Sequence, residues 1–290
     1  MYKYSIIIPH KNSPELLERC IQSIPSREDV QIVVVDDNSD PEFVDFTNFP
    51  GNKRSDVITI FTKEGRGAGY ARNVGINNAS GQWALFADAD DFYEEGFLEV
   101  LDKELDDEDV LFFNVKANVP DADCRGNKIN IQYNKLFENA KERIRFTYWA
   151  PWNKVFNLKW VKDNSFQFDE TPIVNDAFFC LTVSAQANRY KIINNPLYVL
   201  TDQPGSITYK ARSFERGLLV LKQDLKINKL LKENGIKYVR AGTITIASIM
   251  QSIKRNGWRK TKKILNEVRQ YNSIIKELLD ALIYNLKYKY

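Results

Sequence analysis

The sequence predicts an α/β fold with a mostly parallel central sheet flanked by helices, followed by a helical C-terminal extension. Short apolar runs alternate with helical patterns from residue 4 to residue 115, as in a parallel sheet. Polar clusters follow three of these runs, and leucine and isoleucine recur at helical spacing after residue 213. With 290 residues the chain can bury a sizeable core, so we expect one large domain with a helical appendage.

The apolar runs of the first 115 residues are short and continuous, which is typical of strands buried on both faces. They occupy residues 4–9, 31–35, 57–61, 83–87 and 110–113. The first helical pattern begins at Ser13, with Pro14 at its first position. Further helical patterns cover residues 41–49, 68–79 and 94–105.

The second half of the chain has a weaker pattern. Residues 121–128 are polar and turn-like, whereas residues 138–149 have helical character. We expect residues 150–210 to form short strands, turns and a helix over 176–187. From residue 213 onward the pattern is mainly helical.

Composition and charge exclude several classes of protein. The net charge is +3, from 41 basic and 38 acidic residues, so nothing favours a nucleic-acid partner. The three cysteines, Cys20, Cys124 and Cys180, are far apart and odd in number, which disfavours a disulfide framework or a zinc site and indicates a reducing cytoplasm. No apolar run reaches bilayer-spanning length, so we expect neither a signal peptide nor a transmembrane helix.

The acidic cluster Asp88, Asp90 and Asp91 comes directly after an apolar run. Carboxylate oxygens suit Mg²⁺ and Mn²⁺, and in an extended segment Asp88 and Asp90 point in related directions. The alternative is a helix cap, in which Asp90 or Asp91 begins a helix near Tyr93. Taken alone, an Asp-x-Asp motif favours the cap.

Two further polar clusters shift the balance from the helix cap toward a binding site, because the carboxyl ends of parallel strands share one edge of a sheet. Asp36 and Asp37 follow the second run and can accept hydrogen bonds from a base or a ribose, or else form a turn. The glycines of residues 65–69 allow close approach to a ligand, and Arg66 and Arg72 suit a pyrophosphate. The alternative is a flexible loop with Arg72 in a structural ion pair.

The order of these segments resembles family 2 glycosyltransferases of the GT-A fold. The matching segments are SIIIPHKN, VVVDDNSD, GRGAGYARNVGINNASG and FADADD, followed by PWNKVF at 151–156 and NDAFF at 175–179. Residues 204–208, PGSIT, resemble the serine-containing segment that lies downstream in the family. The resemblance covers roughly residues 3–210 and rests on the order of several motifs.

On the donor side, the resemblance implies a role for five matching residues. Pro9 and Lys11 line the nucleotide site, and Asp37 binds the base, with uracil favoured. Arg72 supports the nucleotide or its pyrophosphate, and Asp88 binds the ribose or the sugar. One departure is Lys11, which stands where the family usually has an aromatic residue, so base stacking there is in doubt.

For catalysis, the resemblance makes Asp90 the ligand of a Mn²⁺ or Mg²⁺ ion and Asp176 the general base. Trp152 and Asn153 lie near the acceptor. Asn175 replaces an acidic neighbour, which leaves Asp176 more acidic than in relatives, all else being equal. A third departure is at residues 202–203, where Asp-Gln stands in place of an arginine.

The resemblance implies an inverting transfer of a sugar from a nucleotide diphosphate, with UDP favoured, to an acceptor hydroxyl. The acceptor is a saccharide or a lipid-linked saccharide, in bacterial surface polysaccharide synthesis. Residues 1–210 then form the GT-A domain, with a nucleotide-sugar-binding half at 1–115 and an acceptor-binding half at 116–210; residues 211–290 form the extension.

Two rival functions stay open. A sugar nucleotidyltransferase of related fold is expected to carry a glycine-rich loop where His10 to Pro14 stand here. A catalytically degenerate carbohydrate- or nucleotide-binding module gains weight from Asn175. His10 is the single histidine, which excludes a histidine-rich metal site, and we interpret it as a polar residue at a strand end.

The C-terminal extension also has two interpretations. Residues 255–263 are basic, and residues 278–290 mix apolar, tyrosine and lysine side chains. The helices either pack on the catalytic domain or on another subunit of a homo-oligomer, or they contact an anionic membrane surface. In the second case the protein is peripheral at the inner face of the membrane.

Overall fold

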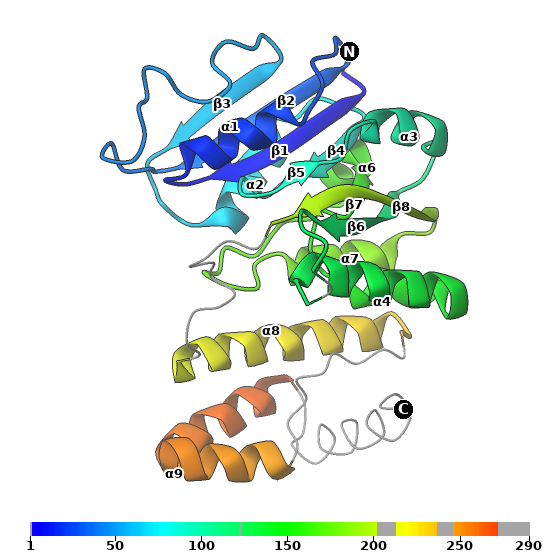
Figure 1. The fold of residues 1–290 in the computed structure, drawn as a ribbon. Helices are drawn as coiled ribbons and strands as arrows, with labels where there is room; N and C mark the ends of the chain where they lie inside the picture. Colours follow the sequence, from blue (N-terminus) through cyan, green and yellow to red (C-terminus); the bar gives the residue numbers. More distant parts are fainter. Residues whose placement is uncertain (1, 122, 202–212, 237–245, 272–290) are drawn as a thin grey trace. The chain divides into compact units, whose positions relative to one another are not determined.

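The structure is a computed structural model that describes residues 2–121, 123–201, 213–236 and 246–271 (Figure 1). The chain divides into two compact units, residues 1–208 and residues 209–290. None of the described helices combines the length and the apolar character that crossing a membrane requires.

One eight-stranded sheet, in the order β3-β2-β1-β4-β7-β6-β8-β5, forms the centre of the first unit. Its strands are β1 (Tyr4–His10), β2 (Val30–Asp37), β3 (Val57–Thr62), β4 (Trp83–Phe86), β5 (Phe92–Tyr93), β6 (Val110–Ala117), β7 (Lys154–Asn157) and β8 (Tyr190–Leu200). β3, β2, β1 and β4 run parallel, β7 is antiparallel to both β4 and β6, β8 is parallel to β6, and β5 is antiparallel to β8. The predicted α/β fold with a mostly parallel sheet is therefore confirmed.

The helices of this unit cover both faces of the sheet. They are α1 (Pro14–Gln22), α2 (Ala68–Asn78), α3 (Phe97–Glu104), α4 (Arg125–Asn139), the 3₁₀ turn η1 (Lys141–Arg143), α5 (Ile144–Thr147), α6 (Leu158–Asp163) and α7 (Ala177–Gln186). α1 begins at Pro14 after Ser13, as predicted. The predicted helix over residues 41–49 is wrong. The Asp40 and Asp45 side chains accept backbone N–H groups of nearby residues there, and these local bonds form turns instead.

The region between β6 and β7 differs most from expectation. Residues 121–128 were predicted to be turn-like, but α4 begins at Arg125. The predicted helix over 138–149 is present only as η1 and α5. α4 packs on the sheet through a short apolar stripe that includes Ile129, Tyr133, Leu136 and Phe137, and asparagines also join it to β6. The Asn130 amide donates to the Val115 carbonyl at 2.6 Å, and the Asn114 amide donates to Asn134 at 3.1 Å.

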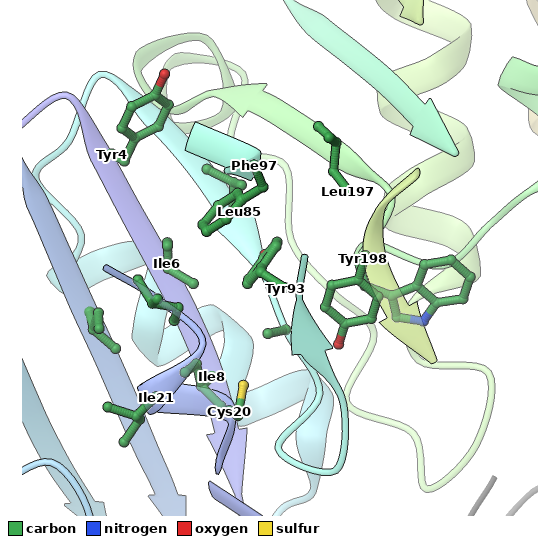
Figure 2. Close-up of a cluster of buried hydrophobic side chains, with 14 of the residues drawn as sticks. Tyr4, Ile6, Ile8, Cys20, Ile21, Leu85, Tyr93, Phe97, Leu197 and Tyr198 are labelled. Carbon is green, nitrogen blue, oxygen red and sulfur yellow. The ribbon is translucent and has the colours of Figure 1, made fainter. Parts of the chain in front are cut away.

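Alternating side chains of the central strands build two separate cores, one on each face of the sheet. Figure 2 shows the first, in which Tyr4, Ile6 and Ile8 of β1 meet Tyr93 and Tyr198. On the other face, α2 packs closely on β1. A Cβ at Gly75 would lie 2.3 Å from Cγ2 of Ile7, so only glycine permits this approach.

The second unit contains α8 (Phe214–Glu233) and α9 (Ile246–Tyr271) within the residues that the structure describes. Leu225 of α8 and Val268 of α9 are buried against each other, with Leu221, Ile264 and Tyr271 around them. The predicted C-terminal helices are thus confirmed for the described residues.

Candidate functional site

Three aspartates form a turn directly after β4. Asp88, Asp90 and Asp91 each offer a carboxylate oxygen, and these atoms lie within 4.8 Å of one another. The alternative that Asp90 or Asp91 caps a helix is wrong, because residues 92–93 form a strand and α3 begins only at Phe97. The acidic cluster is therefore free of a capping role and faces the carboxyl edge of the sheet.

Neutral groups at the end of β8 hold this acidic turn in place. The Asp88 N–H donates to the Tyr198 hydroxyl at 2.9 Å, and the Thr201 N–H donates to Oδ1 of Asp91 at 2.7 Å (Figure 2 shows Tyr198). The Thr201 hydroxyl also donates to the backbone carbonyl of Asp90. Neither Tyr198 nor Thr201 was singled out from the sequence, since they lie more than a hundred residues away.

The charges of the acidic turn are only partly compensated by protein. Burial, together with the charge of Asp88, raises the pKa of Asp90 and, much further, that of Asp91. The Arg19 guanidinium donates to the Asp90 backbone carbonyl rather than to its carboxylate. Among the residues that the structure describes, no lysine or arginine forms an ion pair with the Asp90 carboxylate.

The acidic turn fits a hard divalent cation. Mg²⁺ and Mn²⁺ take oxygen ligands, and Mg²⁺ is commonly held by one or two carboxylates together with substrate phosphates. Asp91 is 4% exposed and already accepts a bond from Thr201, so the partly exposed Asp90 and Asp88 are the side chains that would hold the ion. A cation there would also offset the mutual repulsion that raises the pKa of Asp90.

Arg72 of α2 links the acidic turn to a second polar group. Its Nη2 atom donates to Oδ1 of Asp88 at 2.6 Å, and its Nη1 atom donates to Oδ1 of Asn175 at 2.9 Å. The structural ion pair considered for Arg72 is therefore present. The side chain is buried, and its Nε atom has no partner among the described residues. A role for Arg72 in pyrophosphate binding stays a prediction.

Asp176 lies at the N-cap of α7, next to Asn175. Burial raises the pKa of its carboxyl; the positive charge of Arg72 lowers it, and the negative charge of Asp88 raises it further. A partly buried carboxylate with a raised pKa is a stronger proton acceptor than an exposed one, as a general base requires. Arg72 therefore lies between this candidate base and the acidic turn, because it bonds to both Asn175 and Asp88.

A buried lysine that was not singled out from the sequence lies close to this base. Lys154 is fully buried, and its Nζ atom donates to the carbonyls of Tyr148 and Ala150 and to Oδ1 of Asn153. Burial lowers the pKa of Lys154 to about 8, and the nearby negative charge of Asp176 opposes this shift. The available signal was a lysine at the start of the apolar strand KVF, where a charged residue is unusual.

The two residues assigned to the acceptor lie inside the protein. Trp152 is 3% exposed and stacks on Tyr198 with ring centroids 5.8 Å apart. Asn153 is 0% exposed, and its Nδ2 atom has no partner in the described part of the chain. Their place beside an acceptor stays a prediction.

At the nucleotide end, the Asp37 carboxylate closes the glycine-rich loop. It accepts the backbone N–H groups of Arg66 at 3.0 Å and of Gly67 at 2.7 Å. Gly67 has φ 92°, a conformation that favours glycine, and it is the N-cap of α2. Lys11 is exposed and donates to the Asp37 carbonyl at 3.0 Å, whereas Pro9 is buried in β1.

The remaining contacts of this end are within the protein. The Arg66 guanidinium forms an ion pair with Glu170 and lies over the Tyr70 ring. A Cβ at Gly69 would lie 2.1 Å from the Asp169 carbonyl oxygen, so that glycine admits neighbouring backbone. The nucleotide roles of Pro9, Lys11, Asp37 and Arg66 stay predictions.

His10 is structural, as its position at a strand end suggested. Its Nε2 atom accepts the Ser13 N–H at 3.1 Å, so Nδ1 carries the proton and donates to Asp36 at 2.8 Å. Asp36 also accepts the Ser39 N–H, which is the turn expected for this cluster. The family-like segment at 204–208, the Asp-Gln pair at 202–203 and residues 278–290 lie outside the described residues.

Comparison with known proteins decides the family. Residues 5–166, more than half of the chain, match the model of glycosyl transferase family 2. The chain belongs to this family. It is therefore a glycosyltransferase.

Two curated members of the family are similar over much of this chain. The cholesterol galactosyltransferase of Borreliella burgdorferi is 25% identical over 262 residues, covering 81% of this chain and 69% of that protein. The poly(ribitol-phosphate) β-N-acetylglucosaminyltransferase TarS of Staphylococcus aureus is 25% identical, covering 68% of this chain and 35% of TarS. The chain therefore spans about a third of the length of TarS.

Two solved glycosyltransferases share the architecture. TarS 1–349 in complex with UDP-GlcNAc aligns with a TM-score of 0.69 at 20% identity, covering 99% of this chain and 88% of that one. The mannosyltransferase PcManGT from Pyrobaculum calidifontis, in complex with GDP-Man and Mn²⁺, aligns with a TM-score of 0.56 at 15% identity, over the same shares of the two chains. At such identities the alignments establish the fold, which is of the GT-A type.

Proposed function

We propose that this glycosyltransferase is metal-dependent and inverting, and that it moves a sugar from a UDP-sugar to an acceptor hydroxyl. The observation that carries the proposal is the link through Arg72, which joins the acidic turn at Asp88 to the loop that ends in Asp176. The acidic turn, as the candidate site for the donor diphosphate, and Asp176, as the candidate base, are thus joined by the hydrogen bonds of Arg72. The name of TarS describes transfer of a sugar to poly(ribitol-phosphate). It supports a role for this chain in the synthesis of a bacterial surface polysaccharide.

In this mechanism the donor diphosphate binds beside the acidic turn, with Asp90 and Asp88 as the residues that hold Mn²⁺ or Mg²⁺. The ion supplies positive charge that stabilises the departing nucleoside diphosphate. Arg19 contacts the Asp90 backbone carbonyl and not the carboxylate, which leaves the partly exposed carboxylate oxygens to the ion.

Proton transfer falls to Asp176. Its carboxylate accepts the proton of the acceptor hydroxyl while that oxygen forms a bond to the anomeric carbon. The bond from the anomeric carbon to the diphosphate oxygen breaks in the same step, and the leaving nucleoside diphosphate takes the electron pair. A single displacement inverts the anomeric configuration and needs no covalent intermediate on the protein. The acceptor is a saccharide or a lipid-linked saccharide.

A donor panel tests the proposal. The full chain is incubated with UDP-, GDP- and dTDP-sugars and Mn²⁺, and the released nucleotide is measured with and without EDTA. We expect metal-dependent release of UDP from one or more UDP-sugars, because slow transfer to water proceeds even without the acceptor. Release from GDP- or dTDP-sugars alone would refute the choice of UDP. Formation of a nucleotide sugar from a sugar phosphate and a nucleoside triphosphate would instead support the rival nucleotidyltransferase.

A further inference from the structure

The helix α9 of the second unit contains a sharp corner. Gly257 has φ 75° and ψ 166°, which lies outside helical geometry, so residues 246–256 and 258–271 form two separate helical arms. Figure 1 draws these arms in orange and red, meeting at an angle. A positive φ of this size is tolerated by glycine, and the corner therefore depends on Gly257.

Hydroxyl groups fix the geometry of this corner. The Thr261 hydroxyl, which is fully buried, donates to the Gly257 carbonyl at 3.1 Å. Its single proton is then used, so the Ser252 hydroxyl donates to Oγ1 of Thr261 across the two arms at 3.0 Å. The corner is thus held by bonds within the chain, whatever else it contacts.

The corner concentrates positive charge. Six of the twelve residues from 252 to 263 are basic and none is acidic, although the whole chain carries only +3. The six residues are exposed: Lys254, Arg255, Arg259, Lys260, Lys262 and Lys263. Within the part of the chain that the structure describes, none of them forms an ion pair.

Most basic side chains of the second arm lie away from its packed face; the exception is Lys260, whose Nζ atom lies over the Phe214 ring of α8. Ile264 and Val268 pack toward Leu225 of α8. At 100° per residue, Arg259 and Lys262 then fall on the opposite face of the helix. The second arm is therefore amphipathic: one face packs on α8, and the opposite face is basic and exposed.

An exposed tryptophan stands at the tip of the corner. Trp258 follows Gly257 directly and is 59% exposed, and Ile253, five residues earlier on the first arm, is 39% exposed. Trp and basic residues together are the combination that suits a membrane–water interface, where indole lies at headgroup depth and Lys and Arg meet anionic lipids. A soluble polyanion would satisfy the basic residues without a place for the indole.

We propose that the corner at residues 252–263 docks on the headgroups of anionic lipids, with Trp258 entering the interfacial layer. The occupant follows from charge complementarity and from the exposed indole at the apex. The surface shares no residue with the sugar-transfer site, so the two proposals can fail separately. Its consequence is that the enzyme works where a lipid-linked acceptor is found.

Co-sedimentation of the full chain with vesicles tests this docking. We expect binding to vesicles of phosphatidylcholine with 30% phosphatidylglycerol, weak binding to pure phosphatidylcholine, and release at roughly 0.5 M salt, since salt screens surface charge. The triple variant R255Q/R259Q/K263Q should lower the partition coefficient roughly 100-fold, from about fivefold per basic residue. A matched control is K128Q/K159Q/K229Q, which removes three exposed lysines that each lie beside an acidic partner.

A second pair of variants tests the indole. Trp258→Ala should weaken vesicle binding severalfold, whereas Phe43→Ala, which removes a ring that is 58% exposed in the first unit, should not. Equal binding to both kinds of vesicle, or an unchanged partition of the triple variant, would overturn the proposal. So would tight binding to polyphosphate that Trp258→Ala leaves unchanged, because it would assign the surface to a soluble polyanion. If a variant unfolds, the lipid and salt dependence of the wild-type protein decides alone.

Discussion

The acidic turn and the segment around Asp176 are linked by Arg72, which bonds to Asp88 of the turn and to Asn175, yet the two are built in different ways. The turn is anchored mainly by neutral groups, the Tyr198 hydroxyl and the Thr201 backbone, and of its three carboxylates Asp88 forms an ion pair, with Arg72. Around Asp176 the neighbours are themselves charged and buried, with Arg72 and Lys154 both lowering its pKa. Neutral anchors do not neutralise the carboxylates of the turn, which can therefore bind a cation. The buried charges of Arg72 and Lys154 instead change the pKa of Asp176. Under the proposed function, cation binding and proton transfer therefore fall to two differently built parts of one site.

The largest effect should come from the base. Asp176→Asn keeps the size and polarity of the side chain but cannot accept the proton, so kcat for sugar transfer should fall by roughly 10²–10⁴. Donor affinity, measured by calorimetry with Mn²⁺, should stay near the wild-type value. Because burial raises the pKa of Asp176, its ionised form costs stability at neutral pH, and the Asn variant should have an equal or higher Tm.

A control variant separates this result from a general loss of charge. Asp163→Asn removes an exposed carboxylate that pairs with Lys159 at the end of α6, and it should leave kcat unchanged. Wild-type turnover in Asp176→Asn would contradict the assignment of the base.

Changes in the acidic turn should affect donor binding first. Asp90→Ala should weaken Mn²⁺-dependent donor binding roughly 10–100-fold, by analogy with the loss of groups that support a metal ion. Asp91→Asn is the matched variant, because Asp91 is buried and bonded to the Thr201 N–H. Asparagine can still accept that bond, so donor affinity should change far less. Calorimetry with and without Mn²⁺ distinguishes the two, and equal losses would contradict the separate roles.

The same contrast explains how much could be predicted from sequence. The strands and the acidic turn were predictable because their signals are local: an apolar run followed by Asp88-Ala89-Asp90. The anchors of the turn, Tyr198 and Thr201, were not, since only the pairing of β8 with β6 and β5 brings them there. Lys154 left a signal, a charged residue in an apolar strand, but two of its three acceptors are backbone carbonyls, which no residue type in the sequence marks.

Removing an anchor should have an intermediate effect. Tyr198→Phe takes away the hydroxyl that accepts the Asp88 N–H, which leaves a buried donor unsatisfied and should lower the free energy of unfolding by about 1–3 kcal/mol. The released turn should also weaken Mn²⁺-dependent donor binding. Tyr133→Phe is the control, since it removes another buried hydroxyl, which donates to the Ile193 carbonyl at 2.9 Å and belongs to the core on the other face of the sheet. Urea denaturation should show similar losses for both, with donor binding impaired only in Tyr198→Phe.

The smallest effect should be a shift in pH dependence on replacing Lys154. Its positive charge lowers the pKa of Asp176, so Lys154→Met should move the acid limb of the kcat/KM profile to higher pH, while Lys154→Arg should leave it in place. A purely structural role would lower activity at every pH without moving the limb. Stability provides a second readout. Since the folded pKa of Lys154 is about 8 and its ordinary value is 10.5, the unfolded chain binds more protons between these values, and Lys154 makes stability rise with pH across that window. That rise should disappear in Lys154→Met, and a variant that keeps both the rise and the wild-type acid limb would show that the buried charge does not act on Asp176.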